Sequence, residues 1–488
     1  ALPLALIVCF GLNAPAQTPS AAPTDKAVSA SKAERKNRAP VSKEVLRVKL
    51  PKPIETKLDN GLTVLILEDH RLPNVTLQFL INGAGPLDEP ADRPGLASTT
   101  AQMLREGTAT RQSKQIAEES DRLGATVFAS SGFGSPEAVV SASGLSDNFD
   151  QWFALATDVL LHPSFPAGEL NKLKQRQLVS LRQQRSSPAF LGAERFNRAV
   201  YGTFPAAIVS ATPESIQSMT AEMLANWHRE RYVPQNAILG IAGDVDAAQL
   251  IPKLKKALAE WKKTDFEEKL PRNPKPATEK RILLVNRPNS VQTNLILGNI
   301  AIDRRSPDYI AMTVMNRVLG GGPAGRLFLK LREDKGYTYG AYSTFASAQF
   351  PGPWRATSDV RTEVTDGAMT EFMNELRRIR EEKVPAAELQ ESEHSLVAGF
   401  ALSLEQPAQL LGYAITRKIY NLPDDYWDTY PAKIAAVTAD DVERVAKKYL
   451  DLDTVQIVAV GDAGKIKTIL EKYGPVTVYD TEGKVAPN

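Results

Sequence analysis

The sequence lacks the residues on which several common catalytic and structural devices depend. Its 488 residues include one cysteine, Cys9, so no disulfide can form within the chain. The four histidines stand at positions 70, 162, 228 and 394, and no two of them are four residues apart. A metal motif with two histidines on one helical turn is therefore excluded. A G-x-S-x-G motif is also missing, which argues against a serine hydrolase of the nucleophile-elbow type.

A charge excess of either sign is missing as well. The chain has 59 Lys plus Arg against 57 Asp plus Glu, and this balance argues against nucleic acid as a partner. No apolar run is long enough to cross a bilayer, so we expect no stable membrane insertion. The length is sufficient for two or more domains with apolar cores.

The N-terminal residues resemble a targeting segment. The apolar run Leu2 to Leu12 precedes the small-residue site Ala14-Pro15-Ala16, as in a secretory signal that lacks its basic start. We therefore expect residues 1–16 to be a truncated secretory signal and the protein to be periplasmic or secreted. An apolar tail on a cytoplasmic protein is the alternative. Residues 17–52 are rich in Ala, Ser, Pro and Lys, which predicts a disordered leader or an extended arm.

The second half of the chain repeats the first. Four pairs of anchors recur at an offset of 218 or 219 residues: Pro188 and Pro407, Tyr201 and Tyr420, Thr220-Ala221 and Thr438-Ala439, and Gly243-Asp244 and Gly461-Asp462. This repeat predicts two homologous α+β domains. We place them at 53–261 and 280–476, joined by a proline-rich linker at 262–279 and followed by a tail at 477–488.

The stretch from Gly320 to Ser343 reads as a turn, a helix, a second turn and a strand. Glycines at 320–322 break the preceding helical pattern, and Gly336 ends the next helix. Arg332 and Tyr339 lie on the two sides of this helix-to-strand turn, so we expect their side chains to converge on one ligand. No Gly-Lys-Ser/Thr follows the glycines, which argues against a phosphate loop. The structural alternative is a glycine-rich loop with a surface arginine and strand tyrosines.

The run G-G-G-x-x-x-R-L-F-x-x-L-R-E-x-x-G-Y-x-Y at 320–339 resembles the C-terminal signature of the pitrilysin/insulinase-type zinc metallopeptidases. In that family an Arg and a Tyr seven residues apart hold the substrate against the metal centre, and Arg332 and Tyr339 match this pair. The resemblance covers Pro53 to Val476. It implies two duplicated α/β-sandwich-type domains, each an antiparallel sheet covered by helices, that face each other like a shell.

The zinc motif of the family's catalytic members is degenerate in this chain. Those members carry H-x-x-E-H on a helix just before a Gly-Thr dipeptide. The matching segment, Pro94 to Thr108, keeps the frame but has Ser98, Ala101 and Gln102 where the family has the first His, the catalytic Glu and the second His. We therefore expect no metal in this chain.

The family's third ligand is a Glu on a helix some seventy to eighty residues further on. It is expected at 177–180, yet residues 170–193 contain no acid. The strand after Gly124 also departs from the family's substrate-binding pattern, so we assign it no such role.

A chain that loses the zinc motif but keeps the Arg/Tyr pair resembles the non-catalytic subunit of heterodimeric members. The resemblance implies a partner with an intact H-x-x-E-H that holds zinc, while Arg332 and Tyr339 act in trans on the peptide substrate and its transition state. The chain alone is then inactive. The alternative is a catalytically inactive scaffold or peptide-binding protein of the same fold. An independent hydrolase that uses other residues is disfavoured.

Overall fold

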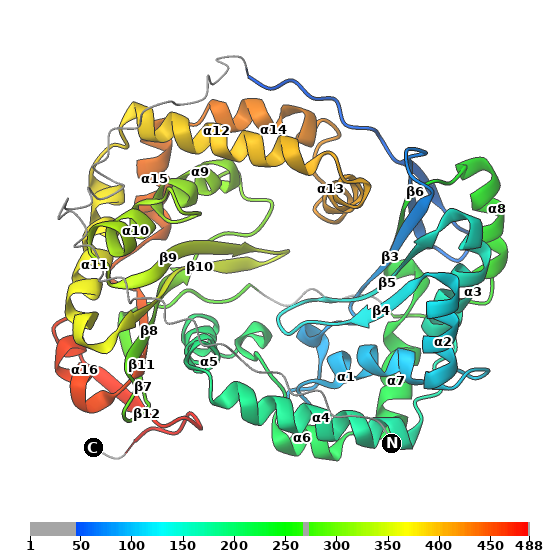
Figure 1. Ribbon diagram of the computed structural model, residues 1–488, viewed down its shortest axis with the longest axis horizontal. Coiled ribbons are helices and arrows are strands. Elements are labelled where there is room, and N and C mark those ends of the chain that lie inside the picture. The colour runs from blue at the N-terminus through cyan, green and yellow to red at the C-terminus, as the bar shows by residue number, and fades with distance from the viewer. Residues whose placement is uncertain (1–44, 267–272, 487–488) are drawn as a thin grey trace, which may run out of the picture.

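Two six-stranded sheets face each other in the computed structural model, each with helices on its outer side (Figure 1). The structure describes residues 45–266 and 273–486, so the expected signal at 1–16 and most of the expected leader lie outside the described residues. No helix in the described part of the chain combines the length and the apolar character needed to cross a bilayer.

The first half contains one sheet and eight α-helices among its described residues. The strands are β1 (Ile54–Lys57), β2 (Thr63–Glu68), β3 (Asn74–Asn82), β4 (Thr126–Ser130), β5 (Glu137–Leu145) and β6 (Ala237–Gly243). The helices are α1 (Leu96–Met103), α2 (Ser113–Leu123), α3 (Phe149–Leu161), α4 (Ala167–Arg185), α5 (Pro188–Tyr201), α6 (Pro213–Ser218), α7 (Ala221–Arg231) and α8 (Ala247–Ala257).

Among the described residues, the second half repeats this order from β2 to α8, has no counterpart of β1 and adds the strand β12 at its end. Its strands are β7 (Arg281–Asn286), β8 (Gln292–Ile300), β9 (Thr338–Ser347), β10 (Pro351–Arg361), β11 (Gln456–Gly461) and β12 (Val476–Tyr479). Its helices are α9 (Tyr309–Leu319), α10 (Arg326–Phe328), α11 (Thr365–Glu381), α12 (Ala386–Ser403), α13 (Pro407–Ile419), α14 (Tyr426–Ala435), α15 (Ala439–Tyr449) and α16 (Ala463–Glu471). A π-helical segment, η6 (Leu329–Asp334), continues α10.

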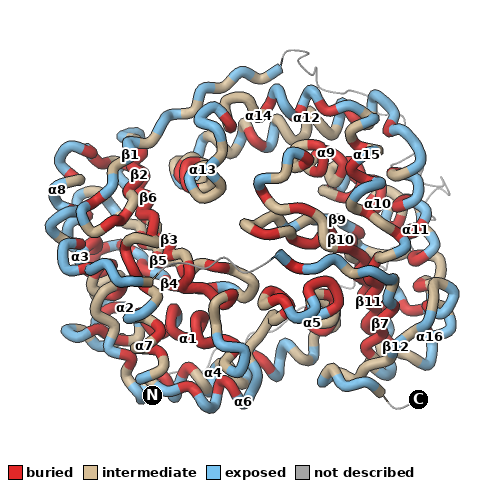
Figure 2. The backbone as a smooth tube through the Cα atoms, turned by 180° about the vertical axis from the view of Figure 1, so that it is seen from behind, coloured by how far each residue is buried: buried red, intermediate tan, exposed pale blue. Residues whose placement is uncertain are grey.

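The expected α+β class with two homologous domains is confirmed, but the sheets are mixed and not wholly antiparallel. Their orders are β1-β2-β6-β3-β5-β4 and β12-β7-β11-β8-β10-β9. The central strands β6 and β11 each follow a long helical segment, α3 to α7 and α11 to α15. They run parallel to β2 and β7. Every residue of both strands is buried, as expected for strands covered on both faces (Figure 2).

Each half places one helix on the sheet of the other half. Helix α5 packs Phe196 and Val200 into the same cluster as Ile296 and Val458 of the second sheet. Helix α13 of the second half packs in turn on the first sheet. Its residues Leu411, Ala414 and Ile415 cluster with Leu65, Leu67 and Ile238 of that sheet.

The close approach of α13 depends on a glycine. A Cβ added to Gly240 of β6 would lie 2.8 Å from Ile415 Cδ1 and 2.9 Å from Leu411 Cδ1. The anchors Pro188 and Pro407 are the first residues of α5 and α13, so the sequence repeat marks the exchanged helices. The exchange joins the two halves through apolar contacts that neither half makes alone.

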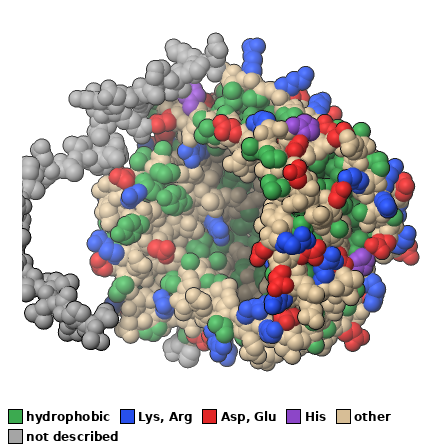
Figure 3. Space-filling view, turned by 45° about the vertical axis from the view of Figure 1, so that its right-hand side comes forward, with side chains coloured by type: hydrophobic (Ala, Val, Ile, Leu, Met, Phe, Trp, Pro, Cys, Tyr) green, Lys and Arg blue, Asp and Glu red, His purple; other side chains and the backbone are tan. Residues whose placement is uncertain are grey.

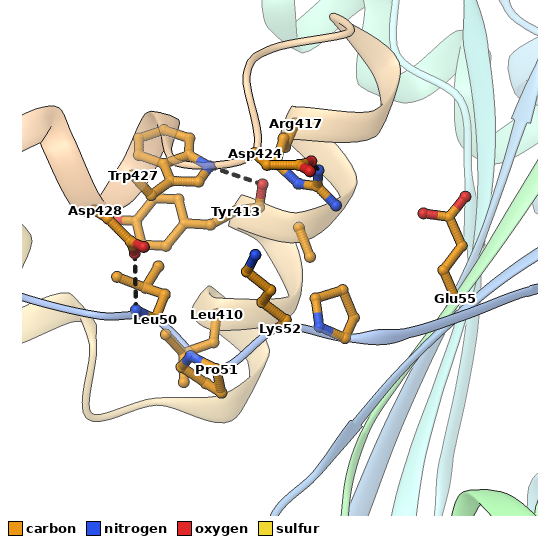
Figure 4. A pocket seen from close by; sticks show the side chains of 12 residues that line it. Leu50, Pro51, Lys52, Glu55, Leu410, Tyr413, Arg417, Asp424, Trp427 and Asp428 are labelled. Carbon is orange, nitrogen blue, oxygen red and sulfur yellow. Dashed lines mark hydrogen bonds and ion pairs between the residues drawn. The ribbon is translucent and has the colours of Figure 1, made fainter.

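The two ends of the described chain also join the halves. Residues 45–53 run as an extended arm along the second half toward β1, and the Leu50 amide donates to Asp428 Oδ1 at 2.9 Å (Figure 4). At the other end, β12 pairs parallel with β7, so the tail expected at 477–488 begins inside a strand of the second sheet. Tyr479 of that strand lies under the Arg195 guanidinium of α5, 3.6 Å away.

Candidate functional site

The predicted helix-to-strand turn is present, although its helix is irregular. Helix α10 has three residues and passes into the π-helical η6, a form that is often found at functional positions. Gly336 then takes φ = 62°, in the left-handed region that favours glycine. Its amide donates to the Arg332 carbonyl at 3.0 Å, and the Tyr337 amide donates to the Leu331 carbonyl at 2.9 Å. These two hydrogen bonds close the turn and direct the chain into β9.

Tyr339 lies in a β-bulge on the edge strand β9. Thr338 is opposite Val360 and Ala341 is opposite Ser358, so Tyr339 and Gly340 together face a single residue of β10. Bulges of this kind re-aim side chains and are frequent beside active sites. The Tyr339 side chain is 91% exposed. The phenol is therefore held out from the sheet into solvent.

Hydrogen bonds among residues of β9 and β10 hold the bulge in place. The Thr338 hydroxyl lies 2.6 Å from the Asp359 carbonyl and accepts from the Gly340 amide at 3.1 Å. The buried Ser358 hydroxyl lies 2.9 Å from the Gly340 carbonyl. The backbone on both sides of Tyr339 is thus held while its side chain makes no hydrogen bond to the described residues.

Arg332 projects from η6 over an aromatic ring. Its guanidinium lies 4.8 Å from the centroid of Phe328, and that ring lies 5.5 Å from the ring of Tyr342. The Arg332 side chain remains 46% exposed, with a long 3.6 Å contact to Glu333. The structure places Arg332 and Tyr339 on the two arms of one turn. It also shows that Tyr342, which sequence reasoning did not assign to the site, supports Arg332 through Phe328.

We expect Thr338→Val to disturb the position of Tyr339 without unfolding the protein. Valine keeps the size and the β-branched shape of threonine but removes the hydroxyl that holds the bulge. Under the function proposed below, kcat should fall by about tenfold, less than when the Tyr339 hydroxyl itself is removed. Thr344→Val, which also changes a threonine of β9, is the matched control. Equal kcat values for the two variants would show that the bulge does not position Tyr339.

Two of the three degenerate metal positions line a depression of about 330 Å³ between α1 and α4 in the first half. Ser98 and Gln102 of α1 line it, and so do Gln177 and Ser180 of α4, where the third ligand was expected. The Gln177 amide donates to Thr99 Oγ1 at 3.1 Å and joins the two helices. Ala101 is fully buried and does not reach the depression. The two helices that would carry the metal ligands are therefore side by side, but the ligands themselves are replaced.

These residues do not fit a zinc ion. Zinc sites in proteins use Cys, His, Asp or Glu, whereas the polar groups of this depression are hydroxyls, amides and the Arg176 guanidinium. Across residues 45–266 and 273–486 there is no group of three such ligands placed to hold a metal.

Sequence reasoning missed Glu89, which holds the start of α1. Its carboxylate accepts from the Gly95 amide at 2.8 Å and from the Ala97 amide at 2.5 Å. Burial raises the pKa of Glu89 to about 7, while the backbone hydrogen bonds oppose that rise. The only available signal was an acid a few residues before a Pro-Gly pair, which is too common to single out.

Comparisons with known proteins place the chain in a family. The family model described as "Insulinase (Peptidase family M16)" matches residues 63–204, and the model described as "Peptidase M16 inactive domain" matches residues 218–396. The chain belongs to peptidase family M16. The resemblance to the pitrilysin/insulinase-type family, found in the signature at 320–339, is thus confirmed.

Among curated relatives in family M16 is an uncharacterized zinc protease of Rickettsia felis, 26% identical over 83% of this chain and 97% of its own length. Another is a Bacillus subtilis protein that is also described as an uncharacterized zinc protease, 24% identical over 71% of this chain and 83% of its own.

A solved structure described as a peptidase M16 inactive domain from Pseudomonas fluorescens has a TM-score of 0.78 and 28% identity. It covers 84% of this chain and 98% of its own. A protease from Helicobacter pylori, with a TM-score of 0.77 and 19% identity, shares the fold.

Proposed function

We propose that this M16 protein is a non-catalytic subunit that supplies Arg332 and Tyr339 to a zinc-bearing homologous partner during peptide hydrolysis. One observation carries the proposal. Tyr339 is held almost fully exposed on a bulged edge strand, across one turn from Arg332, in a chain whose own metal positions hold neutral side chains. The backbone around Tyr339 is held by hydrogen bonds, yet its exposed side chain does not pack into the core.

The two side chains suit different parts of the reaction. The Tyr339 hydroxyl would donate a hydrogen bond to the oxygen that gains negative charge as the scissile carbonyl is attacked. The Arg332 fork would bind another substrate carbonyl or a carboxylate, and its stacking on Phe328 sets the plane of the guanidinium beforehand. Zinc would come from the H-x-x-E-H partner, and this chain would bind none.

The molecule offers a concave face for such work. Figure 3 shows a surface hollowed down its middle. A peptide-binding scaffold of the same fold is the competing function. It would need neither the exposed phenol nor the guanidinium. We also propose a periplasmic or secreted location, on the basis of the signal-like residues 1–16.

Arg332→Lys should chiefly weaken substrate binding by the assembled pair. Lysine keeps the charge but loses the planar fork and the stacking on Phe328, so we expect KM to rise by about tenfold with a smaller change in kcat. Arg281→Lys is the matched control, because Arg281 is also exposed and lies on β7, four strands away from β9 in the second sheet. The measurement is steady-state cleavage of a quenched fluorescent peptide. An unchanged KM in Arg332→Lys would remove Arg332 from the site.

A further inference from the structure

A second pocket, of about 430 Å³, lies in the second half among α9, α12, α13 and α14. Its position corresponds through the duplication to the depression between α1 and α4, because α9 repeats α1 and α12 repeats α4. The residues that line this pocket are mainly aromatic and cationic, unlike those of the depression between α1 and α4. Arg304, Tyr309, Gly399, Phe400, Trp427 and Tyr430 are among the residues that form it.

Arg304 is a buried cation without a carboxylate partner among the described residues. Its side chain is 5% exposed, and its guanidinium lies 3.8 Å from the centroid of the Tyr309 ring. Nη1 donates to the Tyr426 hydroxyl at 2.9 Å. No other hydrogen bond to the described residues is made by the guanidinium, so Nε and Nη2 keep their donors. An arginine stays charged in proteins, and an unpaired buried charge is costly.

Asp308, at the N-terminal end of α9, is engaged by another helix. Asp308 accepts hydrogen bonds from three side chains of α15: Arg444 at 2.6 Å, Lys448 at 2.8 Å and Tyr449 at 2.6 Å. Burial raises the pKa of Asp308, but these donors outweigh burial and hold that pKa well below its usual range. Asp308 therefore remains an anion bound to α15, and it forms no ion pair with Arg304.

Arg317 adds a second positive charge to the pocket. It donates to the Gly321 carbonyl at 2.7 Å and to Ser395 Oγ at 2.5 Å, and it forms no ion pair with a described carboxylate either. No Asp or Glu lines the pocket. The pocket is thus electropositive without a compensating acid, which favours an anionic occupant.

The remaining walls are aromatic. Phe400 lies 5.4 Å from Tyr413 and 5.1 Å from Tyr430, and Trp427 lies 4.3 Å from Tyr413, all between ring centroids. The Trp427 indole donates to the Tyr413 carbonyl at 2.9 Å, which fixes the orientation of the ring (Figure 4). Rigid aromatic walls of this kind bind a flat or apolar group.

We propose that this pocket binds a carboxylate that stands beside an aromatic group, as in the C-terminal aromatic residue of a peptide. The carboxylate would accept from the free donors of Arg304, and the aromatic ring would pack against the wall formed by the stacked rings of Phe400 and Trp427. The volume lies in the range of small-ligand sites. Neither Arg332 nor Tyr339 lines the pocket, so binding here stands or falls independently of the function proposed above.

Titration of the full chain with N-acetylphenylalanine tests the proposal. Trp427 is partly exposed in the pocket while the other four tryptophans are buried, so tryptophan fluorescence reports on occupation. The acid should bind at least tenfold more tightly than N-acetylphenylalaninamide, because the amide has no charge to pair with Arg304. A pentapeptide ending in phenylalanine, with a free or an amidated C-terminus, distinguishes a peptide end from a free small acid. Tight binding of the free-ended peptide supports the peptide source, and its failure to bind contradicts it.

Gly399→Leu provides a variant that keeps the fold. A Cβ at Gly399 meets no atom within 4 Å, and glycine inside a helix is unfavourable, so leucine should leave the melting temperature equal or higher. Its side chain should enter the pocket and weaken binding at least tenfold. Gly168→Leu is the matched control on the equivalent helix α4, where a Cβ also meets nothing. Equal affinity for acid and amide, or wild-type binding by Gly399→Leu, would overturn the proposal.

Discussion

Replacing Tyr339 with phenylalanine is expected to lower the kcat of the assembled peptidase pair by about a hundredfold or more. The substitution removes one hydroxyl and keeps the ring. That hydroxyl makes no hydrogen bond to the described residues, and the side chain is 91% exposed, so the fold does not depend on it. The free energy of unfolding should change by less than about 0.5 kcal/mol. The whole loss then falls on the transition state, where the donor would stabilise developing negative charge.

The measurement is steady-state cleavage of a quenched fluorescent peptide after assembly has been verified by light scattering. Tyr473→Phe is a control, because Tyr473 follows α16, a helix on the outer side of the molecule (Figure 1), where it packs partly buried against the second core. Tyr342→Phe is a second control on the same strand, because it removes a hydroxyl and keeps the ring that contacts Phe328. A Tyr339→Phe pair that assembles and keeps the wild-type kcat would favour the scaffold function.

The second large effect concerns metal. The wild-type chain should retain no stoichiometric zinc after dialysis, whereas the triple variant Ser98→His, Gln102→His, Gln177→Glu should retain about one zinc per chain. The three positions line one depression, and 98 and 102 lie one turn apart on α1. Two imidazoles and a carboxylate supply the ligands that the present hydroxyl and amides do not. Ala101 is left unchanged because it is fully buried.

Elemental analysis of the dialysed proteins measures the difference. The triple alanine variant at the same positions is the control, because it alters the same surface and adds no ligand. One zinc in the wild type would end the non-catalytic interpretation. No zinc in the histidine variant would show that α1 and α4 no longer hold the ligand frame that the shared depression indicates.

Much of the fold was predictable because its signals are local. Gly336, the predicted end of the helix before β9, takes φ = 62°, as expected for a glycine that ends a helix. The repeat at 218 or 219 residues identified the two domains. It did not indicate that α5 and α13 cross to the opposite sheets, because an apolar helix face carries no information about which apolar surface will cover it.

The candidate site was predictable in its residues but not in its geometry. The spacing of Arg332 and Tyr339 across Gly336 is a property of the sequence. The bulge at Tyr339 depends on the register of β9 against β10, and that register is set by hydrogen bonds to Ser358 and Asp359 on another strand.

The divided site is tested most directly by the peptidase activity of a zinc-bearing M16 homologue from the same genome, measured with and without this chain. If Arg332 and Tyr339 complete the site in trans, activity should rise at least tenfold and saturate at one chain per homologue. An Arg332→Ala, Tyr339→Phe double variant should assemble equally well and restore almost none of that gain. Full activity of the homologue alone, or equal activation by the double variant, would contradict the mechanism.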